Sequence, residues 1–358
     1  MHKKLFIPGP VDVREDVLAK MATPMIGHRT PEATELQKSI SEKMQKLMFT
    51  DNLIILSTSS GSGLMEAGVR CLSKKRIACF SVGAFGKRWY EMAISNGKEA
   101  DFFESEPGQP TTPEMVEEAL KTGKYDAITV THNETSSGIM NPCAEIGEVV
   151  KRYPDVIYMV DSVSSLGGAK IETDAWGIDY LVTSTQKCLG LPAGMSIAAI
   201  SERALERAET VENRGFYFDL VQLAKRVKKD YQYPSTPSLE HMFALDYQLD
   251  YILNEEGLEA RFERHRKMAE RVWEWAAKHF ELFAKEGYRS LTVTCIKNPE
   301  DFDFKALNTE LGKRGFTISN GYGPFKGKTF RIAHMADAKP EDLEQVLHEI
   351  EDILGLDA

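Results

Sequence analysis

Asp179-Tyr-Leu-Val-Thr-Ser-Thr-Gln-Lys187-Cys-Leu-Gly190 is the stretch of the sequence that decides the fold. Its apolar run Tyr180-Leu-Val182 predicts a short buried strand, which ends in small hydroxyl residues and a single lysine. Burial lowers the pKa of a lysine, and the neutral amine can form a Schiff base with an aldehyde. A solvated lysine in a loop would give the same short pattern, so both interpretations of Lys187 stay open.

A second stretch of the same kind lies upstream, where the apolar run Val156-Ile-Tyr-Met-Val160 is followed by Asp161. This carboxylate alone is also typical of a turn or a helix cap. A lysine and a carboxylate at the ends of two buried strands are more informative. A pyridoxal phosphate site needs a lysine for the aldehyde and an acidic partner for the pyridine nitrogen.

A Gly/Ser-rich turn follows a third apolar run, Leu53-Ile-Ile-Leu56. The turn, Ser57 to Gly63, precedes a helix predicted over Leu64 to Leu72. Free backbone amides at the start of a helix suit a phosphate group, although a flexible turn would have the same composition. The third glycine of the dinucleotide fingerprint is missing, so this is not a typical dinucleotide site.

These stretches resemble the fold-type I pyridoxal-phosphate enzymes, and within them the class V aminotransferases of the alanine–glyoxylate and serine–pyruvate kind. Separate motifs occur in the family's order, from Pro8-Gly-Pro10 to Phe330-Arg-Ile-Ala-His-Met335, where Ala333 replaces the family's glycine. The resemblance implies an α/β fold with a mostly parallel seven-stranded sheet, which the strand–helix alternation through residue 200 also predicts. It implies a large cofactor-binding domain over 16–256 and a smaller α+β domain made of 1–15 and 257–358.

The resemblance also assigns roles to individual residues. It makes Lys187 and Asp161 the catalytic pair, and gives Arg331 and Gly27 to the substrate carboxylate. The residues that it implies for the cofactor, besides that pair, are Ser62, Gly63, Leu64, Phe85, Thr135 and Gln186, with Tyr233 and Thr236 reaching the phosphate of a neighbouring subunit. Each of these residues also has an ordinary structural interpretation. Phe85 could be a core aromatic, Thr135 part of a polar loop, Tyr233 and Thr236 part of a Pro-rich surface turn, and Arg331 a member of a structural ion pair.

Two segments outside these motifs also give structural predictions. Residues 211–237 are rich in aromatic residues and are predicted to be an irregular functional loop. Leu258 to Ala284 is predicted to form one long helix, with Gly257 as a hinge or domain boundary.

The composition excludes several other classes of function. The net charge is −10 and there is no basic tract, so we expect no nucleic-acid partner. No apolar stretch approaches the roughly 20 residues of a membrane span, and the N-terminus lacks the apolar core of a signal peptide. The five cysteines are scattered without metal-like spacing, which predicts free thiols in the cytoplasm and no metal site.

The resemblance implies a ping-pong aminotransferase that moves an amino group from alanine or serine to glyoxylate or pyruvate, in a homodimer with its site at the subunit interface. Arg331 alone predicts a small neutral substrate, because no second arginine for a dicarboxylate is evident. A phosphonate or phosphoserine transaminase would need further cations, for which His28, Arg29 or Lys87 are candidates.

Two further alternatives are weighed against this prediction. A cysteine desulfurase of the same fold would carry a histidine before the lysine, another histidine on the cofactor ring and a cysteine on a mobile loop. This chain instead has Gln186 and Phe85, while Cys188 adjoins the lysine and Cys295 lies in a predicted strand. A catalytically silent binding protein would not need lysine, aspartate and arginine each in its motif.

Overall fold

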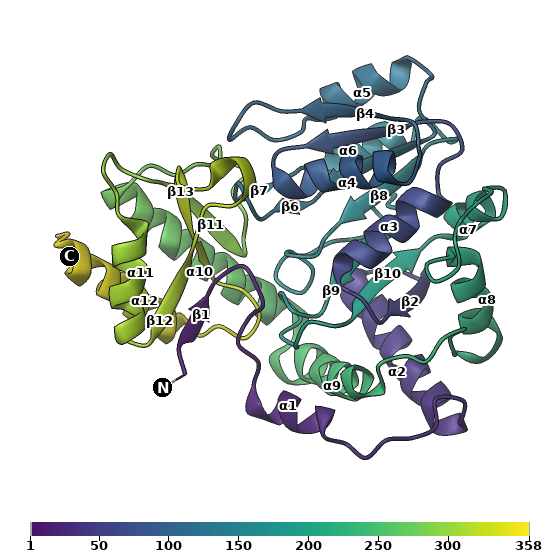
Figure 1. Ribbon diagram of the computed structural model, residues 1–358, viewed down its shortest axis with the longest axis horizontal. Helices are drawn as coiled ribbons and strands as arrows, with labels where there is room; N and C mark the ends of the chain where they lie inside the picture. Colours follow the sequence, from purple (N-terminus) through teal and green to yellow (C-terminus); the bar gives the residue numbers. More distant parts are fainter. Residues whose placement is uncertain (1, 358) are drawn as a thin grey trace.

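The computed structural model describes residues 2–357 and shows two layered bodies side by side (Figure 1). The larger body is built on a seven-stranded sheet and the smaller on a four-stranded sheet. Each body has its own hydrophobic core. None of the helices described is both long and apolar enough to cross a membrane.

The large sheet confirms the predicted mostly parallel architecture. Its strands, in spatial order, are β2 (Leu53–Ser57), β10 (Ser196–Ile200), β9 (Tyr180–Ser184), β8 (Ile157–Asp161), β5 (Ala127–Thr131), β3 (Ile77–Ser81) and β4 (Ala100–Glu104). Only β10 runs antiparallel to its neighbours, β2 and β9. The central strands are buried along their whole length, which explains their nearly continuous apolar sequences.

Helices pack against this sheet and connect its strands. They are α1 (Glu15–Met21), α2 (Pro31–Met48), α3 (Gly61–Cys71), α4 (Ala84–Ser95), α5 (Pro113–Lys121), α6 (Cys143–Val150), α7 (Glu202–Glu209), α8 (Leu220–Asp230) and α9 (Leu239–Asp250). Helix α3 contacts β9 and β10, whereas α4 contacts β3 and β5. A short hairpin, β6 (Asn133–Glu134) with β7 (Ile139–Met140), follows β5.

The small sheet contains one strand from the N-terminal end of the chain and three from its C-terminal part. Its order is β1 (Lys4–Phe6), β12 (Phe316–Asn320), β13 (Thr329–Ala333) and β11 (Val293–Lys297), with α10 (Leu258–His279), α11 (Phe304–Lys313) and α12 (Pro340–Leu354) beside it. Strand β1 pairs in parallel with β12, so the purple N-terminal strand in Figure 1 lies among the yellow-green C-terminal ones. The domain boundaries at residues 15/16 and 256/257 stay a prediction.

Two predictions about these segments were wrong. Helix α8 lies within the segment 211–237 that was predicted to be irregular; Asp219 caps it by accepting from the Val221 amide at 3.0 Å, and Leu220, Leu223 and Val227 bury one face. The helix predicted to reach Ala284 ends at His279, because Phe280 takes an extended conformation. A π-helical turn, Tyr251–Glu256, links α9 to Gly257, and a 3₁₀ turn, Gly323–Phe325, precedes β13.

Candidate active site

Two neighbouring parallel strands bring the predicted catalytic pair to one edge of the large sheet. Asp161 is the last residue of β8 and lies opposite Val182 of β9; Lys187 follows the end of β9 after two further residues. Ligand sites of open parallel sheets form at the carboxyl ends of the strands. The structure brings these two groups close enough that the charge of Lys187 lowers the pKa of Asp161 and the charge of Asp161 raises the pKa of Lys187.

The N-terminal arm encloses the Lys187 side chain. Its Nζ donates a hydrogen bond to the carbonyl oxygen of Pro8. A Cβ atom on Gly9, whose φ is +89°, would lie 2.5 Å from Lys187 Cδ, so only glycine fits there. Burial of the amine, followed by the positive charge of Arg331, lowers the pKa of Lys187 to about 8. We did not predict a role for Gly9, although it lies within the Pro8-Gly-Pro10 motif.

Asp161 is a buried carboxyl group with an unusually high pKa. Burial raises its pKa to about 7, although its Oδ1 accepts a 2.8 Å hydrogen bond from the Val163 amide. The negative charge of Glu134 raises the pKa further, whereas Arg88 and Lys187 lower it. A cation placed against this carboxyl group would therefore restore its ionised form.

The predicted phosphate turn is the first turn of α3, which begins at Gly61 and not at Leu64. The N-cap, Ser60, makes no side-chain hydrogen bond to the helix, and the Gly63 amide donates to the Ser60 carbonyl oxygen at 2.8 Å, so the amides of Gly61 and Ser62 are the first-turn amides that remain available. The buried Ser184 Oγ and Gln186 Oε1 have no hydrogen-bond partner within residues 2–357. The Ser184 hydroxyl can donate to a phosphate oxygen and so fits the phosphate of the cofactor, whereas Gln186 could donate only through its Nε2 and not through the unpaired Oε1.

Of the three residues predicted for that turn, Leu64 contributes in a different way. Its side chain is fully buried in the core, so only its backbone can face a ligand. Gly63 leaves no space for a side chain, because a Cβ atom there would lie 2.4 Å from Ser59 Oγ. Ser62 is half-buried, and its hydroxyl accepts a hydrogen bond from Arg88 Nη1 at 3.2 Å.

Phe85 lies at the start of α4, and the buried Glu134 holds it there. The amides of Phe85 and Gly86 each donate to Glu134 Oε2 at 2.9 Å, and Ser136 Oγ donates to Oε1 at 2.6 Å. The Phe85 ring stacks on Tyr322 of the small body, with centroids 5.4 Å apart and an interplanar angle of 9°. The roles of Glu134 and Tyr322 were not predicted; Glu134 directly precedes the predicted cofactor residue Thr135, whereas Tyr322 gave no clear signal.

Arg331 reaches the site from β13 and has no carboxylate partner within the described chain. Its Nη1 donates to the carbonyl oxygen of Thr135 at 3.1 Å, and its Nε donates to that of Asn320 at 3.0 Å. Burial lowers the pKa of its guanidinium. Thr135 Oγ1 donates to Ser164 Oγ at 2.9 Å, so Thr135 joins Arg331 to the loop after Asp161.

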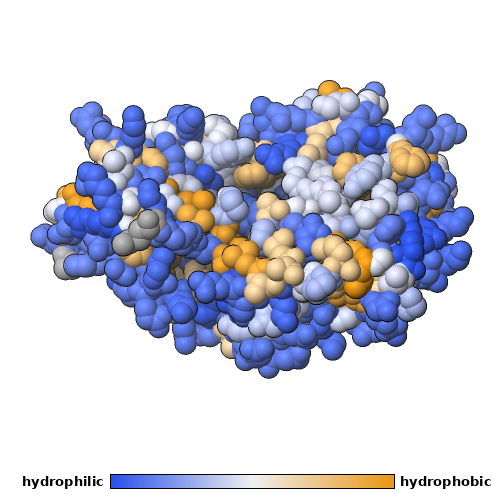
Figure 2. Space-filling model, turned by 60° about the horizontal axis from the view of Figure 1, so that its bottom comes forward, coloured by the Kyte–Doolittle hydropathy of each residue, from blue (hydrophilic) through white to orange (hydrophobic). Residues whose placement is uncertain are grey.

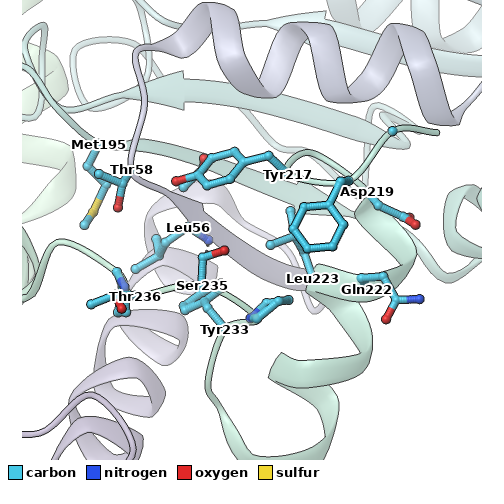
Figure 3. A pocket seen from close by; sticks show the side chains of 15 residues that line it. Leu56, Thr58, Met195, Tyr217, Asp219, Gln222, Leu223, Tyr233, Ser235 and Thr236 are labelled. Atoms are coloured by element: carbon cyan, nitrogen blue, oxygen red, sulfur yellow. Dashed lines mark hydrogen bonds between the residues drawn. The ribbon is translucent and has the colours of Figure 1, made fainter.

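Three predicted residues lie elsewhere. Tyr233 and Thr236 line a cavity of about 370 Å³ beside the end of β2, together with Leu56, Thr58, Met195 and Tyr217 (Figure 3). The Tyr233 hydroxyl accepts from the Leu56 amide at 2.9 Å. Gly27 is exposed, and nearby Arg29 donates to the Pro234 carbonyl oxygen at 3.1 Å. Lys187 is not among the residues that line this cavity.

The seven-stranded sheet and the smaller body define the architecture of the fold-type I pyridoxal-phosphate enzymes. The family model for "Aminotransferase class-V" matches residues 15–329, and the chain belongs to this family of aminotransferases. This result confirms the resemblance on which the site predictions rest.

Individual relatives agree with this assignment. An uncharacterised aminotransferase of Methanocaldococcus jannaschii is 41% identical, over 94% of this chain and 88% of the relative. A serine–glyoxylate aminotransferase of Arabidopsis thaliana is 31% identical, over 98% and 90%. The crystal structure of an alanine–glyoxylate aminotransferase from Nostoc sp. superposes with a TM-score of 0.92 at 28% identity, covering 99% of this chain and 96% of that one.

Proposed function

We propose that this aminotransferase uses pyridoxal phosphate to move an amino group from alanine or serine to glyoxylate or pyruvate. The observation that carries the proposal is the pair formed by Lys187 and Asp161 at the ends of neighbouring strands, with the unpaired guanidinium of Arg331 close enough to lower the lysine's pKa. An amine with a pKa near neutrality is suited to act as a nucleophile and then as a base.

When bound, pyridoxal phosphate would supply an aldehyde within reach of Lys187 Nζ and a ring that accepts electrons from the substrate carbon. Lys187 then moves the proton on and off that carbon. Asp161 would stabilise a positive charge on the pyridine nitrogen, and Phe85 would supply an aromatic face for the ring. Arg331 orients the substrate by binding its carboxylate.

The preference for a substrate without a second acidic group is inferred from the cations of the site, and glyoxylate as an acceptor is inferred from the named relatives. The serine–glyoxylate and alanine–glyoxylate aminotransferases are similar to this chain along nearly its whole length. Arg331 binds one carboxylate, and the other arginine of the site, Arg88, contacts Ser62 of the phosphate turn. We therefore expect amino acids without a second acidic group to be preferred, and phosphonate or phosphoserine substrates to be poor.

We also propose that the enzyme is a homodimer and that Tyr233 and Thr236 complete the partner's phosphate site. Exposed apolar side chains support an interface: Phe216 is 90% exposed beside the cavity of Tyr233, and Met25 is 62% exposed after α1. Figure 2 shows a group of hydrophobic residues near the middle of a face that is otherwise mostly hydrophilic. Large apolar patches on a surface are typical of protein–protein contacts.

The desulfurase alternative is not supported by the cysteines. All five are buried, and burial raises the pKa of Cys188 and of Cys295 to about 11. A nucleophilic cysteine needs an accessible thiolate near neutral pH. The cytoplasmic location stays a prediction.

An absorbance titration tests the proposed function. Purified protein mixed with pyridoxal phosphate should develop a visible band, and Lys187→Ala should lose both the band and turnover. The band should then be lost with alanine or serine in single half-reactions, and much more slowly with aspartate, glutamate or 2-aminoethylphosphonate. A colourless wild-type protein would contradict the cofactor, and a reaction with aspartate but not alanine would contradict the substrate class.

A further inference from the structure

Arg88 is a half-buried guanidinium whose contacts are all uncharged. It lies on α4, one turn after Phe85, with its Cζ 4.7 Å from the centroid of the Phe85 ring. Its Nη1 donates to Ser62 Oγ at 3.2 Å and its Nη2 to the Tyr322 hydroxyl at 3.4 Å. Within residues 2–357, no carboxylate forms an ion pair with it, although its charge lowers the pKa of the nearby Asp161 carboxyl group.

The neighbouring cations behave differently. Lys87, the preceding residue of α4, is exposed and pairs with Glu91 at 3.5 Å. Arg76, at the start of β3, pairs with both Glu99 and Asp101. Leaving a partly buried charge without a counterion costs free energy, so the arrangement around Arg88 calls for an anion.

The first turn of α3 adds a second positive feature at the same place. Ser62 belongs to that turn, where amides without a side-chain cap carry the positive end of the helix dipole. The buried Ser184 Oγ has no partner within the described residues and lies 3.4 Å from where a Cβ of Gly61 would be. A guanidinium, a helix terminus and an unpaired hydroxyl therefore surround one location.

We infer that Arg88 binds the phosphate of the cofactor at the first turn of α3 and so anchors pyridoxal phosphate within its own subunit. This inference rests on the proposed function. The same guanidinium chemistry would also suit a distal carboxylate of a substrate. The 3.2 Å contact with Ser62 favours the phosphate, because Ser62 belongs to the helix terminus. The longer contact, 3.4 Å to the Tyr322 hydroxyl, lies toward Arg331, whose Cζ is 5.8 Å from the centroid of the Tyr322 ring.

The test compares Arg88→Gln with Lys87→Gln, which removes the same charge from the adjacent position without touching Ser62. Apoprotein is titrated with pyridoxal phosphate and, separately, with pyridoxal, which lacks the phosphate; binding is followed by absorbance. Because Arg88→Gln loses a charge-assisted contact, this variant should bind pyridoxal phosphate about 10- to 100-fold more weakly than the wild type does. Its binding of pyridoxal should be unchanged. Arg88→Lys should restore part of the affinity, and Lys87→Gln should bind like the wild type.

Three results would overturn the inference. Equal losses for both ligands would mean that Arg88 supports the ring or the fold. Unchanged cofactor binding, together with a higher KM for aspartate, would assign Arg88 to a distal group of the substrate. A wild-type protein that binds neither ligand would remove the proposed function itself, which distinguishes that failure from the first two.

Discussion

The Lys187 amine has a pKa of about 8 because it is buried under the N-terminal arm and lies near Arg331. Only the neutral amine attacks an aldehyde, so its fraction should set the rate of cofactor capture. We predict that the rate at which apoprotein takes up pyridoxal phosphate rises with pH, with a midpoint near 8. Stopped-flow absorbance measures this rate, and a midpoint above pH 10 would show an ordinary solvated lysine.

The raised pKa of Asp161 predicts a conflict between stability and function. Its pKa is about 7 in the folded apoprotein and near 3.8 in the unfolded chain, because folding buries the carboxyl group. The contribution of protonated Asp161 to the free energy of unfolding is therefore fully present below about pH 4, and it is lost as the pH rises from there through about 7. Each unit of pKa difference corresponds to about 1.4 kcal/mol, so the loss is of the order of a few kcal/mol.

Asp161→Asn should therefore stabilise the apoprotein at pH 8 relative to the wild type, by more than it does at pH 4, while abolishing most of the turnover. Urea unfolding of both apoproteins at the two pH values measures the free-energy difference. An equal effect of the substitution at pH 4 and pH 8 would show that burying the ionised Asp161 carboxylate does not destabilise the folded apoprotein.

At the scale of elements, the start of α4 depends on one carboxylate. Glu134 accepts from the amides of Phe85 and Gly86 and from both donors of Ser136. In Glu134→Gln the side-chain NH₂ would face some of these donors, leaving them unsatisfied. We expect a loss of about 1–3 kcal/mol in the free energy of unfolding and weaker cofactor binding, because the Phe85 turn loosens.

Ser136→Ala provides the matched control for that prediction. It removes the Ser136 hydroxyl, which also accepts from the Ala84 amide at 2.9 Å, and leaves the carboxylate with its three backbone amides. Because one amide loses its acceptor and not several, unfolding in urea should show a smaller loss. Glu134→Gln and Ser136→Ala losing equal stability would contradict a role for Glu134 in holding α4.

The sequence predicted elements well where a local pattern sets them and poorly where it does not. The buried strands that end at Asp161 and Ser184 follow from their apolar runs. Helix α8 was not predicted because the aromatic residues around it are also typical of an irregular loop, although Asp219 and the spacing of Leu220, Leu223 and Val227 indicate a capped helix.

The contacts that complete the site are non-local, which is why no local pattern showed them. Arg88 meets Ser62 across two helices, Tyr322 meets Phe85 from the small body, and Gly9 meets Lys187 from the N-terminal arm. The family motifs named most of the residues for the site, but only the structure shows which hydrogen bonds hold them. The partner-subunit roles of Tyr233 and Thr236 stay predictions.

At the scale of the whole molecule, a shared site makes a prediction about mixed subunits. Lys187→Ala lacks the nucleophile of its own site, and Tyr233→Phe lacks the hydroxyl proposed to serve the partner. A heterodimer of the two should regain one intact site, so unfolding and refolding the mixed variants should produce activity that neither parent has at limiting cofactor. Activity equal to the sum of the separate parents would contradict a site shared between subunits.

The central claim is that Lys187, and no other lysine, carries the cofactor. Reducing the protein with borohydride in the presence of pyridoxal phosphate fixes the bond as a stable amine, and peptide mass spectrometry then locates it. The structure offers a competitor, since burial also lowers the pKa of Lys98. We predict the modification on the peptide that contains Lys187 alone; a modification on Lys98, or one spread over surface lysines, would contradict the account.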